Sequence, residues 1–91
     1  MTTYNLDFVE DAKKEWDALD RGIREAFKKV LARRLQEPRV VSAKLRGGAN
    51  LYKIKLRDVG YRLVYEVEND TVTVLVLAVG RRKAVYARFP D

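Results

Sequence analysis

The chain contains no cysteine and no histidine. Disulfides and thiolate zinc sites are therefore excluded, and a metal centre would depend on carboxylates alone. Ser-His-Asp and Cys-His catalytic arrangements are excluded as well, and no Gly-rich phosphate loop is present. No apolar run approaches the ~20 residues of a membrane-spanning helix, and the first residues lack the pattern of a signal peptide. We expect a soluble, cytosolic protein without metal or cofactor.

Positive charge is in excess and unevenly placed. The sequence has 19 Lys and Arg against 13 Asp and Glu, a formal net charge of +6. Acidic residues crowd the segment from Asp7 to Asp20, and basic residues dominate from Lys28 onward. Such polarity favours a nucleic acid or an acidic protein as partner, although a merely soluble basic surface is the plain alternative. The length of 91 residues suits a single domain, residues 1–91, with one core.

The first half of the sequence predicts a strand and a helical hairpin. Tyr4 to Phe8 alternates weakly, as a short strand does, and Asp7 with Glu10 resembles a capping box at the start of a helix. Apolar residues then recur at helical spacing in two runs, which Pro38 ends: Val9, Ala12, Trp16 and Leu19, then Ile23, Phe27, Val30, Leu31 and Leu35. Because Trp16 and Phe27 lie on these stripes, we assign them to the core.

The second half predicts an antiparallel sheet after a linker over residues 39–50. Segments 51–57 and 60–67 alternate strictly, which places their tyrosines and aliphatic residues on one face and Lys53, Lys55, Arg57 and Arg62 on the other. A third strand is expected from Thr71 to Gly80. Its alternation places Val72, Val74, Val76 and Ala78 on the helix-covered face, and Thr73, Leu75 and Leu77 on the basic face.

A tight turn at Asp58 and Val59 places Lys55 directly opposite Arg62. Like charges across a ladder are destabilising, so a sheet that accepts them is expected to bind something anionic. The basic face is also partly apolar, which suits either a nucleic acid or an amphipathic peptide. The residues alone therefore predict a phosphate-binding face made of cations and phenols.

Four segments together resemble the RelE family of bacterial type II toxins: Lys44-Leu-Arg-Gly, Tyr52-Lys-Ile-Lys-Leu-Arg57, Gly60-Tyr-Arg-Leu-Val-Tyr65 and Val79-Gly-Arg-Arg82. The resemblance runs from about Tyr4 to Tyr86. It implies the compact α+β fold that this family shares with the ParE toxins, with a strand and helical hairpin packed on a C-terminal antiparallel sheet.

The resemblance also implies an activity, the ribosome-dependent cleavage of mRNA in the ribosomal A site, which leaves a 2′,3′-cyclic phosphate and a 5′-hydroxyl. A RelB-like antitoxin would inhibit the toxin in a hetero-oligomer, and the free toxin would be a monomer. The motifs carry the catalytic site over to Lys53, Lys55, Arg62, Arg82 and Tyr86. In the implied roles, Lys55 is the base, Arg62 and Lys53 stabilise the phosphorane, Arg82 serves the leaving oxygen, and Tyr86 orients the nucleophile or stacks on a base.

Two departures from the family pattern concern the end of the chain. The segment from Gly80 to Tyr86 is shorter than expected, and Pro90 argues against a C-terminal helix, which we expect to be absent. Arg81 is a rival to Arg82, because strand alternation from Leu77 would direct Arg81 to the basic face.

Eight further cations are candidates for contacts with RNA or the ribosome: Lys28, Lys29, Arg33, Arg34, Lys44, Arg46, Arg57 and Arg81. Two other functions remain open at this stage. A ParE-like toxin would inhibit DNA gyrase without nuclease activity, and a non-catalytic module would use the groove only to receive an antitoxin segment.

Overall fold

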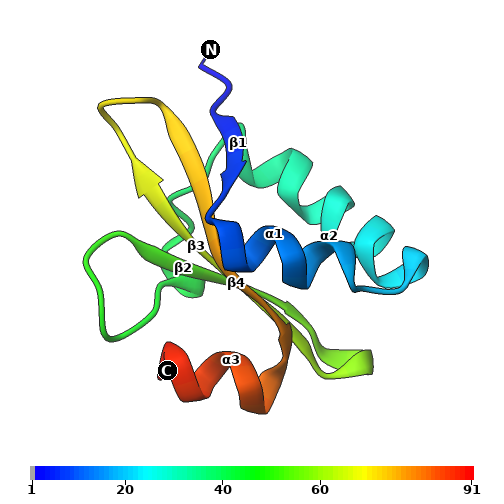
Figure 1. The fold of residues 1–91 in the computed structure, drawn as a ribbon. Helices are drawn as coiled ribbons and strands as arrows, with labels where there is room; N and C mark the ends of the chain where they lie inside the picture. Colours follow the sequence, from blue (N-terminus) through cyan, green and yellow to red (C-terminus); the bar gives the residue numbers. More distant parts are fainter. Residues whose placement is uncertain (1) are drawn as a thin grey trace.

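The computed structural model describes residues 2–91, and Met1 lies outside them. The chain forms the expected α+β fold, with helices packed on a four-stranded sheet (Figure 1). The elements in chain order are β1 (Asn5–Phe8), α1 (Glu10–Asp17), α2 (Arg21–Arg34), the 3₁₀ turn η1 (Val41–Ala43), β2 (Leu51–Leu56), the 3₁₀ turn η2 (Arg57–Val59), β3 (Tyr61–Glu68), β4 (Thr73–Arg81) and α3 (Arg82–Arg88).

The sheet has the strand order β1-β4-β3-β2, and β1 pairs in parallel with β4 while the other pairs are antiparallel. The predicted pairing of Lys55 with Arg62 is confirmed. The connection between β2 and β3 is longer than the predicted two residues, because η2 and Gly60 both belong to it. Gly60 has a φ of 68°, a left-handed conformation that glycine adopts without strain, and the chain reverses there without changing the register.

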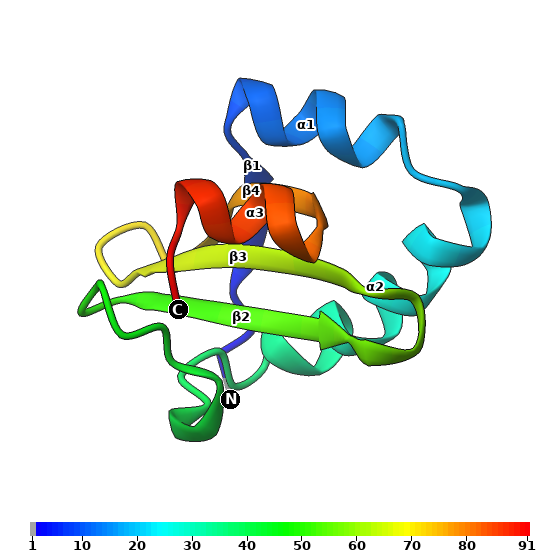
Figure 2. The ribbon, with the colours of Figure 1, turned by 90° about the horizontal axis from the view of Figure 1, so that it is seen from below.

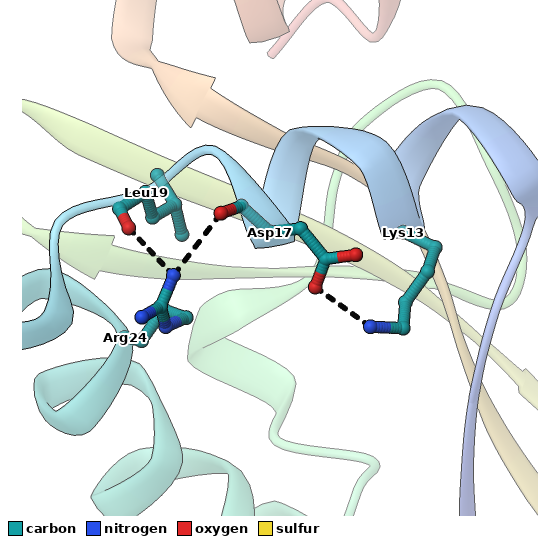
Figure 3. A network of polar contacts seen from close by, with 4 residues as sticks. All are labelled: Lys13, Asp17, Leu19 and Arg24. Atoms are coloured by element: carbon teal, nitrogen blue, oxygen red, sulfur yellow. Dashed lines mark hydrogen bonds and ion pairs between the residues drawn. The ribbon is translucent and has the colours of Figure 1, made fainter.

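Helices α1 and α2 cover one face of the sheet and form the main core, in which Trp16 and Phe27 are buried as predicted. The two helices are held together at their junction by Arg24, which donates hydrogen bonds to the backbone oxygens of Asp17 and Leu19 (Figure 3). The predicted capping box is wrong. The N-cap of α1 is Val9, without a side-chain cap, because the Asp7 carboxylate instead accepts a bond from the N–H of its neighbour Phe8.

A β-bulge divides β4 into two parts with opposite facing. Tyr65 pairs with Val76, whereas Val64 pairs with Ala78, so that Leu77 is an extra residue on β4. Residues Thr73 to Val76 follow the predicted alternation, whereas Val72 precedes β4 and has a φ of 50°, outside the extended conformation. Beyond the bulge the faces exchange, and the prediction that Ala78 faces α1 and α2 is wrong: Val79 packs in the main core, and Ala78 packs on the opposite side.

The opposite face of the sheet is covered in part by α3, which is seen alongside β3 in Figure 2. The expectation that a C-terminal helix is absent is therefore wrong. Pro90 follows the last helical residue, Arg88, and does not interrupt the helix, while Val85 is buried against Leu45, Val64 and Ala78. This second apolar cluster is small, so it anchors α3 and leaves part of the face uncovered.

The 39–50 segment is mostly irregular, as predicted, with η1 inside it and one isolated bridge between Lys44 and Tyr52. Among residues 2–91, no helix is long and apolar enough to cross a membrane. The same residues contain no cluster of three or more carboxylates that could hold a metal ion.

Candidate functional site

Neighbouring strands bring the predicted basic residues onto one face. Lys53 and Lys55 come from β2, and Arg62 comes from β3 directly opposite Lys55. On the other side of Arg62 the paired residue of β4 is Gly80, which has no side chain to occupy this face. Helix α3 passes over the space that remains, and it carries Tyr86.

Arg62 is the one charged residue among residues 2–91 whose side chain the fold buries, with 8% of its surface exposed. Its guanidinium lies 5.9 Å from the centre of the Tyr86 ring, within the range of a cation–π contact. One terminal nitrogen donates to the backbone oxygen of Tyr61 at 2.8 Å, but the buried Nε has no partner in the described part of the chain. The buried Tyr86 hydroxyl is also unpartnered there. Buried polar groups are rarely left unpaired, so these two neighbouring groups single out the contact between Arg62 and Tyr86 as a candidate site.

The electrostatic field of this face acts most clearly on Lys55. The positive charge of Lys53 lowers the pKa of Lys55 below its ordinary value of 10.5, and burial and the charges of Arg57 and Arg62 lower it further. Asp91 opposes these effects. A lowered pKa increases the neutral fraction of the amine near neutral pH, and only the neutral amine can accept a proton.

Lys53 has a carboxylate partner that the sequence did not indicate. Its ammonium group forms a hydrogen-bonded ion pair with Asp91, and the two side chains are only 11% and 18% exposed. The hydrogen bond from Lys53 is the main cause that lowers the pKa of the Asp91 carboxyl. Because the two residues are 38 positions apart, no local motif connects them. A carboxylate at this place offers the lysine the same kind of charge that a phosphate oxygen would offer.

Arg81 and Arg82 are separated by the end of β4. Arg81 is paired with Tyr61, and its guanidinium lies 5.1 Å from the centre of that ring, which packs against the main core. The prediction that Arg81 is directed to the basic face is wrong, because the bulge reverses the facing of the last residues of β4. Arg82 begins α3, and its N–H donates to the backbone oxygen of Gly60. Its backbone therefore lies beside the connection between β2 and β3, and its side chain is exposed.

Glu15 of α1 is a second residue that sequence reasoning missed. One of its carboxylate oxygens accepts the N–H of Val79, just beyond the bulge, at 3.2 Å. The other accepts a hydrogen bond from Arg88 of α3 at 2.6 Å. Glu15 thus connects the irregular part of β4 to the helix that holds Tyr86 over Arg62. The contacts span 64 and 73 positions, so a local pattern could not reveal them.

Of the predicted RNA-contacting cations, Arg34 and Arg57 lie close to Lys53 and Lys55, and the others are spread over α2 and the linker. Lys28, Lys29 and Arg33 are exposed along α2, and Lys44 and Arg46 are exposed in the linker. Arg34 differs from its neighbours, because it reaches the edge of β2 and donates to the backbone oxygen of Lys53 at 3.1 Å. Arg57 lies at the start of η2 and is exposed.

The arrangement can bind an anion and stabilise added negative charge on it. Arg62, Lys53 and Lys55 are held on a rigid sheet, and preorganised cations of this kind favour a transition state that is more negative than its substrate. A phenol and an amine of lowered pKa complete the set. The face has the composition expected for phosphodiester chemistry.

Comparisons with known proteins identify relatives of this chain. The family model described as ParE toxin of type II toxin-antitoxin system, parDE, matches residues 6–86. The mRNA interferase toxin RelE of Escherichia coli (strain K12) is 51% identical over 80 residues, which are 88% of this chain and 84% of that protein. The isolated E. coli RelE toxin in its P21 crystal form superposes with a TM-score of 0.84 at 49% identity, covering 93% of each chain. A chain of the intact E. coli RelBE toxin-antitoxin complex gives a TM-score of 0.83 at 51% identity, covering 86% of this chain and 95% of that one.

This chain belongs to the ParE toxin family of type II toxin-antitoxin systems, and within that family it belongs with the RelE toxins. The resemblance drawn from its strand motifs is confirmed.

Proposed function

We propose that this protein is the toxin of a type II toxin-antitoxin system and acts as an endoribonuclease that cleaves mRNA in the A site of the ribosome. The observation that carries the proposal is the buried Arg62 beside Lys55 and Tyr86, a cationic site without a carboxylate on Arg62. The relatives named mRNA interferase support it. They are 51% identical to this chain, and the gyrase-directed alternative is therefore set aside.

In the proposed reaction the ribose 2′-oxygen attacks the adjacent phosphorus, and the bond from phosphorus to the 5′-oxygen breaks. The products are a 2′,3′-cyclic phosphate and a 5′-hydroxyl. Lys55 in its neutral form takes the proton of the 2′-hydroxyl, and Arg62 with Lys53 stabilises the extra charge on the phosphorane. Arg82 stabilises the leaving 5′-oxygen, which takes up a proton from the solvent, and the hydroxyl of Tyr86 orients the nucleophile.

Dependence on the ribosome follows from the weakness of these groups as acids and bases. Lysine and tyrosine ordinarily titrate near pH 10, far from neutrality. If ribosomal RNA bends the mRNA into an in-line geometry, the protein needs to supply mainly charge stabilisation. We therefore propose that free RNA is cut slowly or not at all.

The proposal extends to where the toxin acts and what inhibits it. Residues 1–91 act as one toxin domain in the cytoplasm, and the free toxin is monomeric. A RelB-like antitoxin inhibits it by forming a hetero-oligomer. The RelBE complex to which this chain is similar supports such a partner.

The test is primer extension on a defined mRNA in a reconstituted translation system, with and without ribosomes. We expect cuts within A-site codons only when ribosomes are present, and loss of these cuts in Lys55→Ala and Arg62→Ala. Lys14→Gln, a change on the exposed part of α1, is the control and should cut like the wild type. Intact mRNA at toxin concentrations that arrest growth would contradict the proposal.

A further inference from the structure

A recess lies at the outer edge of β2, apart from the contact between Arg62 and Tyr86. This recess has a volume of about 320 Å³. It is lined by residues of α2, η1, β2 and η2: Arg34, Ser42, Ala43, Lys53, Lys55 and Arg57. We call it the β2-edge recess. Its lining contains four cations and a hydroxyl and no carboxylate, so its composition is that of an anion site.

Arg34 is held in place at this recess by neutral acceptors. One terminal nitrogen donates both to the backbone oxygen of Lys53 and to the hydroxyl of Tyr65, at 3.1 and 2.9 Å. The Tyr65 hydroxyl in turn donates to the backbone oxygen of Pro38 at 2.6 Å. The remaining N–H groups of the guanidinium bond to none of residues 2–91 in the structure. Arg34 is therefore a preorganised donor with unused capacity, which is the state in which arginine recognises a phosphate.

The charges around the β2-edge recess are only partly neutralised by residues 2–91. Within residues 2–91, Arg34, Lys55 and Arg57 form no ion pair, and Lys53 is the lining cation that has one, with Asp91. The lowered pKa of Lys55, caused first by Lys53 and also by Arg57, reports the same accumulation of positive charge. A bound anion would relieve repulsion that the fold otherwise retains.

We propose that the β2-edge recess binds a phosphodiester group other than the one that is cleaved, with Arg34, Ser42 and Arg57 as its ligands. The recess is large enough for a phosphate with part of its sugar. The paired N–H donors of an arginine guanidinium suit two oxygens of a phosphate. Lys53 and Lys55 lie between the site at Arg62 and the β2-edge recess. The phosphate bound in the recess would therefore belong either to the mRNA strand that is cleaved or to the ribosomal RNA next to it. The assignment of the polyanion as RNA rests on the proposed function.

Binding to uncleavable probes tests this proposal separately from catalysis. The probes are a short 2′-O-methyl RNA and ribosomes that carry an mRNA with a 2′-O-methyl A-site codon. Affinity is measured by fluorescence anisotropy over a series of salt concentrations. We expect Arg57→Gln and Arg34→Gln each to weaken binding about 5- to 10-fold at low salt and to reduce the slope of log K against log salt by about 0.7. Ser42→Ala should weaken binding about 2- to 3-fold without changing the slope, because it removes no charge.

The matched control is Arg21→Gln, which removes one exposed arginine from the first position of the same helix. It should change the affinity less than 2-fold. Arg34→Lys adds a second control: it keeps the charge and loses the fork, so affinity should fall while the salt slope is kept. If Arg34→Gln fails to fold, Arg57→Gln and Ser42→Ala decide the question, because neither side chain forms a hydrogen bond or ion pair within residues 2–91.

The two probes distinguish the sources of the phosphate. Weaker binding to both means that the β2-edge recess holds the substrate strand, and weaker binding to ribosomes alone means that it holds ribosomal RNA. Affinities of Arg57→Gln and Arg34→Gln equal to that of Arg21→Gln on both probes would overturn the proposal. Failure of the wild type to cut mRNA would instead reject the proposed function and leave the comparison of affinities valid.

Discussion

The two faces of the sheet differ in how completely their polar groups are satisfied. Under α1 and α2 the core is large, and its buried phenol Tyr65 both donates and accepts a hydrogen bond. Under α3 the apolar cluster is small, and Arg62 Nε and the Tyr86 hydroxyl lack partners within residues 2–91. Unsatisfied buried groups are costly to a fold. The first face therefore carries most of the stability, and the second keeps groups available for a ligand.

The bulge in β4 is what allows one strand to serve both faces. Val74 and Val76 contribute to the main core before it, and Val79 returns to that core after it, while Ala78 and Val64 support α3 on the other side. Glu15 accepts the N–H of Val79 next to the bulge, so a main-chain donor there is not left unpaired. Helix α3, which carries Tyr86, thus follows a strand, β4, whose pairing is regular apart from the bulge.

The largest change in stability is expected from a core substitution on the first face. Phe27→Ala removes a fully buried ring between the helices and the sheet. Such a change costs about 3–5 kcal/mol, which is a large part of the stability of a domain of this size. Urea unfolding followed by circular dichroism should show a much lower midpoint. A loss below about 1 kcal/mol would mean that this face is not the stabilising one.

On the second face, Arg62→Met should lower activity without lowering stability. Its cleavage of ribosome-bound mRNA should fall about 10²- to 10³-fold, because a preorganised charge is removed. The unfolding midpoint should stay equal to that of the wild type or rise, since an unpaired buried nitrogen and the repulsion with Lys55 are both removed. The readouts are single-turnover cleavage and urea unfolding of the same preparation. A clear loss of stability would show that the guanidinium is part of the core.

The contrast also explains how far the sequence predicted the structure. Strand alternation gave the pairing of Lys55 with Arg62, and helical spacing gave the burial of Trp16 and Phe27, because both patterns are local and repeat along the chain. The bulge inserts a single residue, Leu77, without changing the composition of β4, so alternation misplaced Ala78 and Arg81.

The remaining errors concern the end of the chain. Helix α3 has only 7 residues and is stabilised by the burial of Val85 on the sheet and not by its own propensity. Its ion pair with Glu15 and the contact between Lys53 and Asp91 join distant parts of the sequence. The pattern of the sequence therefore predicted the basic residues of β2 and β3, whereas Arg82 and Tyr86 came from the family resemblance alone and the helix that carries them was not predicted.

Tyr86→Phe isolates the role of the unpartnered hydroxyl. The ring over Arg62 is retained, so the fold should be as stable as the wild type or slightly more stable. Cleavage should fall about 10-fold if the hydroxyl orients the nucleophile, in the lower range of such contributions. Tyr86→Ala, which also removes the ring, is the comparison and should be more severe. Equal cleavage by Tyr86→Phe and the wild type would leave only stacking as the function of this residue.

The pKa of Lys55 should depend on its neighbour. Lys53→Met removes the charge that lowers it most, so the pKa should rise toward 10.5. Titration of the Lys55 ε-carbon by NMR measures this directly, with Lys14→Gln as control. In the wild type a charged Lys55 disfavours folding below its folded-state pKa, and this penalty is lost progressively as the pH rises from the folded-state to the unfolded-state pKa. Residual cleavage by Lys53→Met should require a higher pH. An unchanged titration would show that Lys53 does not set the basicity of Lys55.

The smallest effect is expected where the second face is already occupied. In the structure the Asp91 carboxylate holds Lys53, so an RNA phosphate that uses this lysine must displace it. Asp91→Asn should increase the affinity for 2′-O-methyl RNA about 2- to 3-fold, because it removes the carboxylate charge that competes with a phosphate for Lys53. The carboxyl has a lowered pKa, so its stabilising contribution is present at neutral pH and is lost as the pH falls through the folded-state value. The advantage of Asp91→Asn over the wild type should therefore disappear at acid pH, and an advantage that persists there would mean that Asp91 does not compete with RNA for Lys53.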